Sequence, residues 1–246
     1  MPTLEEAFAE VAARHLAGAG EDGLPGAEHR LRFARDRWRE GARMAGYLAG
    51  RYPEVVAPGA SLLDLGCGNG GFALPFAERG LAPCWLLDVH PHEELLALRR
   101  RIAVPARHLV ADGTAVPLAD ASVDLALCVE TLEHLPAPRA VGREVARVLR
   151  PGGICFLTTP ARLRYLLAPD PHYEIRGLLL LPDALQRRLF ERVLHRGSRY
   201  AVEHTFWSVA GIARLFPGLS VVEVTSRRWA GPLRRVDWDW VVLRKG

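Results

Sequence analysis

The chain has 246 residues, of which 49% are hydrophobic and 24% charged, a length and balance that fit one globular α/β domain. The net charge of +4 comes from arginines spread along the chain, so nucleic acid is not expected as a partner. The four cysteines show no Cys-x-x-Cys spacing, which excludes a zinc knot or disulfide framework and favours a reducing, cytoplasmic compartment. No apolar run approaches the ~18 residues of a membrane span.

Two amphipathic helices are predicted near the N-terminus. Apolar residues recur at helical spacing in Thr3–Leu16 and again in Glu28–Tyr52, where many arginines stand between them. The glycine-containing stretch 18–26 between the two patterns is expected to be a loop. We expect the second helix to pack through its apolar face and to expose its arginines to solvent.

The most informative stretch is Ser61–Gly71, which predicts a strand, a tight turn and the start of a helix. The run Ser61–Leu65 is short and apolar, as in a buried parallel strand. The glycines allow a sharp turn and close approach of a ligand, and the N–H groups of the following helix favour a negatively charged group. Asp64 instead suits a ligand with a cationic end, and it disfavours the dinucleotide fingerprint that Gly66-x-Gly68-x-x-Gly71 also fits.

The segment Leu63-Asp-Leu-Gly-Cys-Gly-Asn-Gly70 resembles the first motif of the class I S-adenosylmethionine-dependent methyltransferases. The resemblance implies that S-adenosylmethionine is bound by Asp64, Gly66, Cys67 and Gly68. It also implies an α/β fold with a seven-stranded, mostly parallel sheet in the order 3-2-1-4-5-7-6, with strand 7 antiparallel and helices on both faces. From the glycines alone, a plain strand–helix turn without a ligand remains the alternative.

The next two predicted strands also end at aspartates. Asp88 stands near the end of Cys84–Val89, where a carboxylate can accept hydrogen bonds from both hydroxyls of a ribose. The third strand ends in Asp112-Gly113. The resemblance implies that Asp88, with Val89, binds the ribose and that Asp112 and Gly113 hold the adenine. A surface carboxylate and a turn-forming Asp-Gly pair are the alternatives.

The fourth predicted strand, Val123–Val129, leads into Glu130-Thr-Leu-Glu-His-Leu-Pro136. This run, with the later Val148-Leu-Arg-Pro-Gly-Gly153, resembles the small-molecule branch that includes the ubiquinone-biosynthesis O-methyltransferases. The resemblance implies that Val129 contacts the cofactor and that the methyl acceptor is a hydroxyl. His134 is the candidate general base, because imidazole exchanges protons near neutral pH. The alternative is that His134 only shapes the loop.

The same run is similar to the divalent-metal sites of two methyltransferase groups, the ubiquinone O-methyltransferases and the small-RNA 3′-terminal 2′-O-methyltransferases. The second group takes another histidine from a downstream segment, and His204 matches it here. The resemblance therefore suggests a Mg²⁺ or Mn²⁺ site made by Glu130, Glu133, His134 and His204. In the alternative, Glu130 lies near the methionine part of the cofactor and Glu133 points to solvent.

An insertion, residues 161–207, is predicted between the fifth strand, Ile154–Thr158, and a final helix and strand pair in residues 208–246. The resemblance places substrate-specific structure in this insertion, with His172 and Tyr173 as candidate substrate contacts. We expect one domain over residues 1–246, in which residues 1–58 form a helical lid region and residues 59–160 form the cofactor-binding core.

Together these features predict an S-adenosylmethionine-dependent methyltransferase that acts on a hydroxyl of a sugar or secondary metabolite, as a monomer or homodimer. One alternative is a metal-assisted 2′-O-methyltransferase that acts on an RNA end, for which RNA affinity would fall steeply with salt. The other alternative is a domain that binds the cofactor without catalysis. The residues do not name the methyl acceptor.

Overall fold

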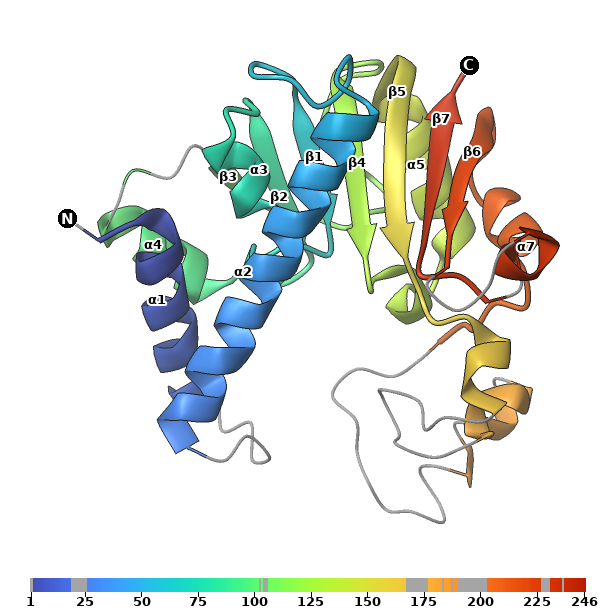
Figure 1. Ribbon diagram of the computed structural model, residues 1–246, viewed down its shortest axis with the longest axis horizontal. Coiled ribbons are helices and arrows are strands. Elements are labelled where there is room, and N and C mark those ends of the chain that lie inside the picture. The colour runs from blue at the N-terminus through green and yellow to red at the C-terminus, as the bar shows by residue number, and fades with distance from the viewer. Residues whose placement is uncertain are drawn as a thin grey trace. The chain divides into compact units, whose positions relative to one another are not determined.

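In a computed structural model, the described residues are 2–18, 26–101, 103, 106–166, 177–182, 184–186, 188–189, 203–226, 231–235 and 237–246 (Figure 1). By its internal contacts the chain forms two compact units. Unit 1 comprises Met1–Leu127 and Val148–Gly153, and unit 2 comprises Cys128–Arg147 and Ile154–Gly246. Among the described residues, no helix is long and apolar enough to cross a membrane.

Seven strands form one sheet in the order β3-β2-β1-β4-β5-β7-β6, which confirms the predicted order. The pairs β1–β2, β1–β4 and β2–β3 are parallel, whereas β7 runs antiparallel to both β5 and β6, as predicted. The strands are β1 (Leu62–Leu65), β2 (Cys84–Asp88), β3 (Ala106–Val110), β4 (Val123–Val129), β5 (Leu149–Thr158), β6 (Leu219–Thr225) and β7 (Trp240–Lys245). All four residues of β1 are buried because this strand lies in the interior of the sheet, between β2 and β4.

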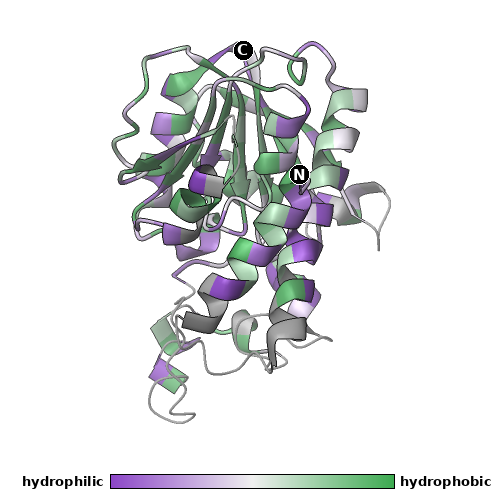
Figure 2. Ribbon diagram, turned by 90° about the vertical axis from the view of Figure 1, so that its left-hand side faces the viewer, coloured by the Kyte–Doolittle hydropathy of each residue, from purple (hydrophilic) through white to green (hydrophobic). Residues whose placement is uncertain are grey.

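Unit 1 contains the helices α1 (Leu4–Gly18), α2 (Gly26–Arg51), α3 (Leu74–Glu78) and α4 (Glu93–Arg101). The long helix α2 buries an apolar face that includes Trp38 and Leu48, and Trp38 packs on Phe8 of α1 with ring centroids 5.2 Å apart. Figure 2 shows that the strands are mostly apolar, whereas the helices carry both polar and apolar residues. The core of this unit therefore lies between β-strands and the apolar sides of its helices.

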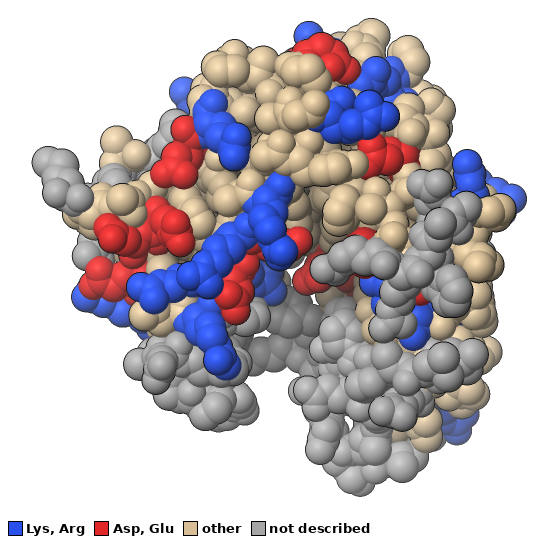
Figure 3. Space-filling view, viewed as in Figure 1, with Lys and Arg blue, Asp and Glu red and all other residues tan. Residues whose placement is uncertain are grey.

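The opposite face of α2 is exposed and rich in arginine, as Figure 3 shows. The exposed arginines follow helical spacing, at Arg32, Arg35, Arg39 and Arg43. Arg39 pairs with Asp36 at 3.6 Å, and Arg43 pairs with Glu40. Acidic partners on the same helix thus offset part of the positive charge, in agreement with the solvated, amphipathic helix expected for residues 28–52.

Unit 2 contains α5 (Pro138–Val148), which ends one residue into unit 1, and α7 (Val209–Ala213). Its described short 3₁₀ helices are η1 (Leu132–His134), η2 (Arg162–Leu166), η3 (Leu178–Leu180) and η4 (Gly231–Arg235). A parallel bridge joins Ala161 to Phe206, and the Arg162 N–H donates to the Phe206 carbonyl at 3.1 Å. The predicted insertion therefore begins and ends at adjacent points of the backbone.

A buried ion-pair network holds the start of this insertion. The guanidinium of Arg164 donates to Asp237 at 2.7 Å, to Asp239 at 3.0 Å and to the Trp238 carbonyl at 2.6 Å. Both aspartate side chains are only 8% exposed, so the pairs are little screened by water. Trp238 is fully buried and donates to the Thr159 carbonyl at 3.1 Å. These hydrogen bonds and ion pairs therefore connect the segment after β5 to the segment before β7 within unit 2.

Candidate functional site

The glycine turn after β1 is shaped by its backbone and bonded to β2. Gly66, Gly68 and Gly70 have φ values of 68°, 51° and 81°, a region that residues with a side chain rarely adopt. The N–H groups of Gly66 and Cys67 both donate to the Leu87 carbonyl, at 2.9 and 3.1 Å. Glycine at these positions therefore lets the chain leave β1 sharply while it remains hydrogen-bonded to the neighbouring strand.

The N–H groups of this turn are mostly used within the protein, contrary to the expectation of a helix N-terminus open to an anion. Gly68 donates to Asp88, Gly70 to the Cys67 carbonyl and Gly71 to the Asn69 side chain. The helix that follows, α3, has only 5 residues and carries a proline at its first positions. Because these N–H groups donate within the turn or to β2, few of them are left to bind a phosphate.

Asp64, on β1, is buried without a full set of hydrogen-bond partners. Its residue is 2% exposed, and among the described residues its Oδ2 atom has no hydrogen-bond partner. Burial, and secondarily the negative charge of Asp88, raises the pKa of Asp64 to about 8. A buried carboxylate of this kind is costly unless a positive group reaches it. The carboxyl is therefore neutral at pH 7 and suited to a cationic ligand.

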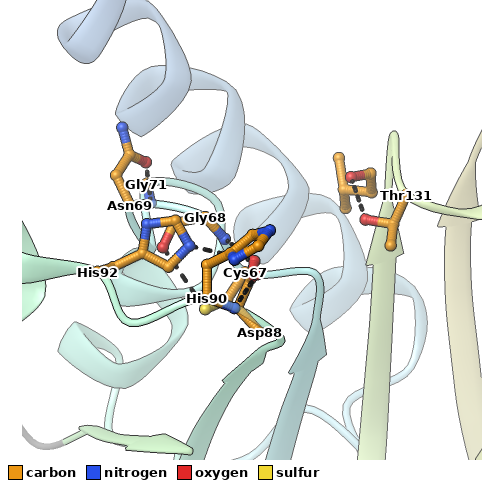
Figure 4. Close-up of polar contacts among 9 residues, drawn as sticks. Cys67, Gly68, Asn69, Gly71, Asp88, His90, His92 and Thr131 are labelled. Atoms are coloured by element: carbon orange, nitrogen blue, oxygen red, sulfur yellow. Dashed lines mark hydrogen bonds and ion pairs between the residues drawn. The ribbon is translucent and has the colours of Figure 1, made fainter. Parts of the chain in front are cut away.

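Asp88, at the end of β2, has the opposite electrostatic environment (Figure 4). Its Oδ2 accepts from the Gly68 N–H at 3.1 Å, its Oδ1 accepts from the His90 N–H at 3.1 Å, and the His92 Nε2 lies 3.3 Å from Oδ2. Partial burial opposes ionisation, but the contacts with His92, His90 and Gly68 outweigh it and lower the pKa of Asp88 to about 2. Asp88 is thus a fixed negative acceptor beside the turn.

The end of β3 lies next to Asp88. The Ala111 N–H donates to the Asp88 carbonyl at 2.9 Å, and the Thr114 N–H donates to Asp112 Oδ1 at 2.8 Å. That hydrogen bond lowers the pKa of the exposed Asp112. Two apolar side chains at these strand ends, Val89 and Val110, are 55% and 57% exposed. They offer an apolar surface next to polar groups, as a flat heterocycle requires.

Unit 1 therefore brings together most of the predicted cofactor-binding residues, namely Asp64, Gly66, Cys67, Gly68, Asp88, Val89, Asp112 and Gly113. Sequence reasoning missed two neighbours. It assigned no role to His92, which contacts Asp88 from four residues along the chain. It also passed over Val110, although Val110 directly precedes Ala111-Asp112 and stands opposite Asp88 in the strand register.

The run after β4 belongs to unit 2 and begins with strained backbone. Glu130 is exposed, has a φ of 49° and donates its N–H to both the carbonyl and the hydroxyl of Thr158, at 3.2 and 3.0 Å. Val129 is buried, and its carbonyl accepts from the Thr131 hydroxyl at 3.0 Å. His134 is half-buried at the end of η1, where its N–H donates to the Thr131 carbonyl at 2.9 Å. This backbone pattern holds His134 in a defined place.

Glu133 is enclosed completely, which contradicts the alternative in which it points to solvent. The residue is 0% exposed, and neither of its carboxylate oxygens has a hydrogen-bond partner among the described residues. Burial raises the pKa of Glu133 to about 8, against a smaller opposite effect of its own backbone and of the nearby Thr159 hydroxyl. Its carbonyl accepts the N–H groups of Glu203 and His204, at 2.8 and 3.0 Å.

The suggested metal site is not formed. The backbone brings residues 203 and 204 to Glu133, but within the described part of the chain no group of three or more His, Cys, Asp or Glu side chains could hold a metal ion. The reason is visible in Glu133, which is enclosed, and in Glu130, which faces solvent. The predicted substrate contacts His172 and Tyr173 lie outside the described residues.

The family whose sequence profile matches this chain is described as "Methyltransferase domain", and the match covers residues 63–157. An uncharacterized methyltransferase of Mycobacterium sp. (strain JLS) is 37% identical over 105 residues, which are 43% of this chain and 40% of that protein. Another, of Mycobacterium ulcerans (strain Agy99), is 39% identical over 112 residues, which are 46% of this chain and 43% of that protein. The chain therefore spans about two fifths of the length of the curated relatives it matches.

Solved structures show the same fold. A methyltransferase from Mesorhizobium loti, described as S-adenosylmethionine dependent, has a TM-score of 0.55 and 23% identity, and the match covers 81% of this chain and 96% of that one. The cyclase SpnF has a TM-score of 0.55 and 17% identity, and the match covers 99% of this chain and 96% of that one. At these identities the likeness establishes the fold alone.

The raised pKa values predict how stability changes with pH. Between pH ~4 and ~8 the folded protein keeps a proton on Asp64 that the unfolded chain loses, because the unfolded carboxyl titrates near 3.8. Each such carboxyl should lower the free energy of unfolding by up to about 1.4 kcal/mol per pH unit across this range. Urea titrations from pH 4 to 9 should show this fall, which Glu133 shares, and Asp64→Asn should make it shallower.

The exposed Asp120 provides the matched control. Asp120→Asn should follow the wild-type curve, and Glu133→Gln should also reduce the slope, because burial raises the pKa of this carboxyl as well. Parallel curves for the wild type and Asp64→Asn would show that Asp64 titrates at its ordinary value.

Proposed function

We infer that the chain, whose residues 63–157 belong to the methyltransferase domain family, is an S-adenosylmethionine-dependent methyltransferase. The observation that carries this inference is the buried Asp64 carboxyl, which has an oxygen without a hydrogen-bond partner among the described residues. S-adenosylmethionine carries an ammonium group that such a carboxylate would bind. A dinucleotide would instead bring a pyrophosphate, for which this turn has few unused N–H groups.

The remaining residues of the unit 1 site fit the other parts of the same ligand. Asp88 is ionised and held in place by two backbone N–H groups, so its carboxylate can accept hydrogen bonds from ribose hydroxyls. The exposed Val89 and Val110 fit the face of an adenine, next to the Asp112-Gly113 turn. The set is therefore two carboxylates and an apolar surface, which suits a zwitterionic nucleoside better than a phosphate ester.

When bound, S-adenosylmethionine supplies a methyl group on a sulfonium. We propose that the acceptor is a hydroxyl of a small molecule such as a sugar or secondary metabolite. The imidazole of His134 would take up the hydroxyl proton as the acceptor oxygen receives the methyl group and S-adenosylhomocysteine leaves. Support for His134 comes from its half-buried position and from the main-chain hydrogen bond to the Thr131 carbonyl, which holds the backbone that carries the imidazole. Residues 161–207 are the proposed source of acceptor specificity.

Cofactor binding is tested by calorimetry with S-adenosylhomocysteine, which keeps the ammonium, the ribose and the adenine. The wild type should bind it with micromolar affinity, and Asp64→Asn and Asp88→Asn should each weaken binding by about tenfold or more. Asp64 ionises on binding, so about one proton should be released per complex at pH 7, measured in buffers of different ionisation enthalpy. Asp120→Asn is the control with unchanged affinity. Wild-type affinity in Asp64→Asn would refute the role of this carboxyl.

Catalysis is tested with methyl-labelled S-adenosylmethionine, offered together with a small-metabolite extract in one reaction and with RNA in another. Label should enter the small molecules, and His134→Gln should lower the rate by about 10²-fold or more while the affinity for S-adenosylhomocysteine stays unchanged. Label in RNA would contradict the acceptor class. Tight cofactor binding without label transfer to either mixture would instead favour a domain that binds the cofactor without catalysis.

A further inference from the structure

Helix α2 touches the backbone that follows the glycine turn, and it does so at one glycine. A Cβ atom added to Gly41 would lie 2.6 Å from the Phe72 carbonyl oxygen, 2.7 Å from the Gly71 carbonyl oxygen and 2.9 Å from the Phe72 Cα. Real Cβ atoms essentially never come so close, and the atoms in the way are backbone, which cannot swing aside. Gly41 lies within α2, where glycine lowers helix propensity, so the close approach rather than a turn explains its presence.

Side chains from both N-terminal helices, α1 and α2, also contact Gly71 and Phe72. A Cβ on Gly71 would meet the Phe8 ring of α1 at 2.9 Å and the Arg37 Cβ of α2 at 3.1 Å. The Arg37 guanidinium lies over the Phe72 ring, 5.1 Å from its centroid. Because Phe8 also packs on Trp38 of α2, the helices α1 and α2 enclose residues 71 and 72 together.

The other side of the turn is equally close-packed. A Cβ on Gly70 would lie 2.9 Å from the Leu95 side chain of α4 and 3.3 Å from the Leu86 side chain of β2. The turn is thus held between the leucines on one side and α2 on the other. Any displacement of residues 71 and 72 by α2 has to be taken up by the turn 66–70.

We propose that Gly41 is a positioning residue, which acts through Gly71 and Phe72 to hold the turn 66–70, and hence Asp88, where the cofactor binds. The link to Asp88 is the Gly68 N–H, which donates to its Oδ2 at 3.1 Å. This proposal rests on the proposed function, because it concerns the affinity for the same cofactor. By thermodynamic linkage, a ligand that needs the turn in this place also stabilises the packing of α2 on it.

The first test is Gly41→Ala, with Gly50→Ala as the matched control on the same helix. An added Cβ at Gly50 meets no atom within 4 Å. Both substitutions therefore raise helix propensity, but only Gly41→Ala is expected to displace the turn. Calorimetry with S-adenosylhomocysteine should show affinity about tenfold weaker for Gly41→Ala and unchanged for Gly50→Ala. The pH dependence of binding should keep its shape in both, because neither change alters a titrating group.

A second measurement keeps the proposal testable if Gly41→Ala does not fold. In the wild type, S-adenosylhomocysteine should slow hydrogen exchange of the α2 amides around Gly41 more than it slows exchange in α5. A folded Gly41→Ala protein with wild-type affinity, or α2 amides that do not respond to the ligand, would overturn the positioning role. Absence of ligand binding by the wild type would instead refute the proposed function, so the two failures are distinguishable.

Discussion

The site in unit 1 depends on the contrast between two neighbouring carboxyls. Asp64 is enclosed in the sheet and holds its proton to a pKa of about 8, whereas Asp88 accepts two backbone N–H groups and stays ionised to a pKa of about 2. Each environment is set by strand position: Asp64 lies inside β1, between two other strands, and Asp88 ends β2 beside the turn. The pair therefore has one fixed negative charge and one mostly protonated carboxyl, whose ionisation a bound cation would favour.

This arrangement needs the turn to stay in place, and unit 1 provides that by packing rather than by charge. The turn uses its own N–H groups internally, and glycines at residues 41, 70 and 71 allow neighbouring elements to approach its backbone. The N-terminal helices are therefore part of the structure that shapes the site. Their exposed arginines are a separate feature, partly offset by acidic partners on the same helix.

The strand order could be predicted because the glycine-turn motif resembles a family with that sheet, and the carboxylates at strand ends could be predicted from local patterns. Short apolar runs that end in Gly or Asp mark parallel strands, and Asp64 and Asp88 stand at the spacing that the resembled family shows. The exposure of Glu133 could not be predicted, because it depends on how η1 meets residues 203 and 204, far along the chain. The suggested metal site, which needed an accessible Glu133, is therefore not supported among the described residues.

Two further differences arise from hydrogen bonds that a sequence does not display. The helix after the turn was expected to offer free N–H groups, but the Gly70 carbonyl accepts those of Ala73 and Leu74, and the turn itself donates three N–H groups to Leu87 and Asp88 of β2. The fifth strand was expected to begin at Ile154, but β5 already begins at Leu149, and a Cβ on Gly153 would lie 2.9 Å from the Asp124 carbonyl of the adjacent β4. In both cases pairing with a neighbouring strand overrode the local signal of glycine and proline.

In the proposed function, Asp64 is a neutral, buried acid that ionises to receive a cationic ligand. The most direct measurement is the pKa of its side-chain carboxyl carbon by NMR, with the resonance assigned by its loss in Asp64→Asn. We predict a pKa near 8 in the free protein, and a fall of about two units or more when S-adenosylhomocysteine is bound. A pKa near 4 in the free protein, or one near 8 that the bound ligand leaves unchanged, would contradict it.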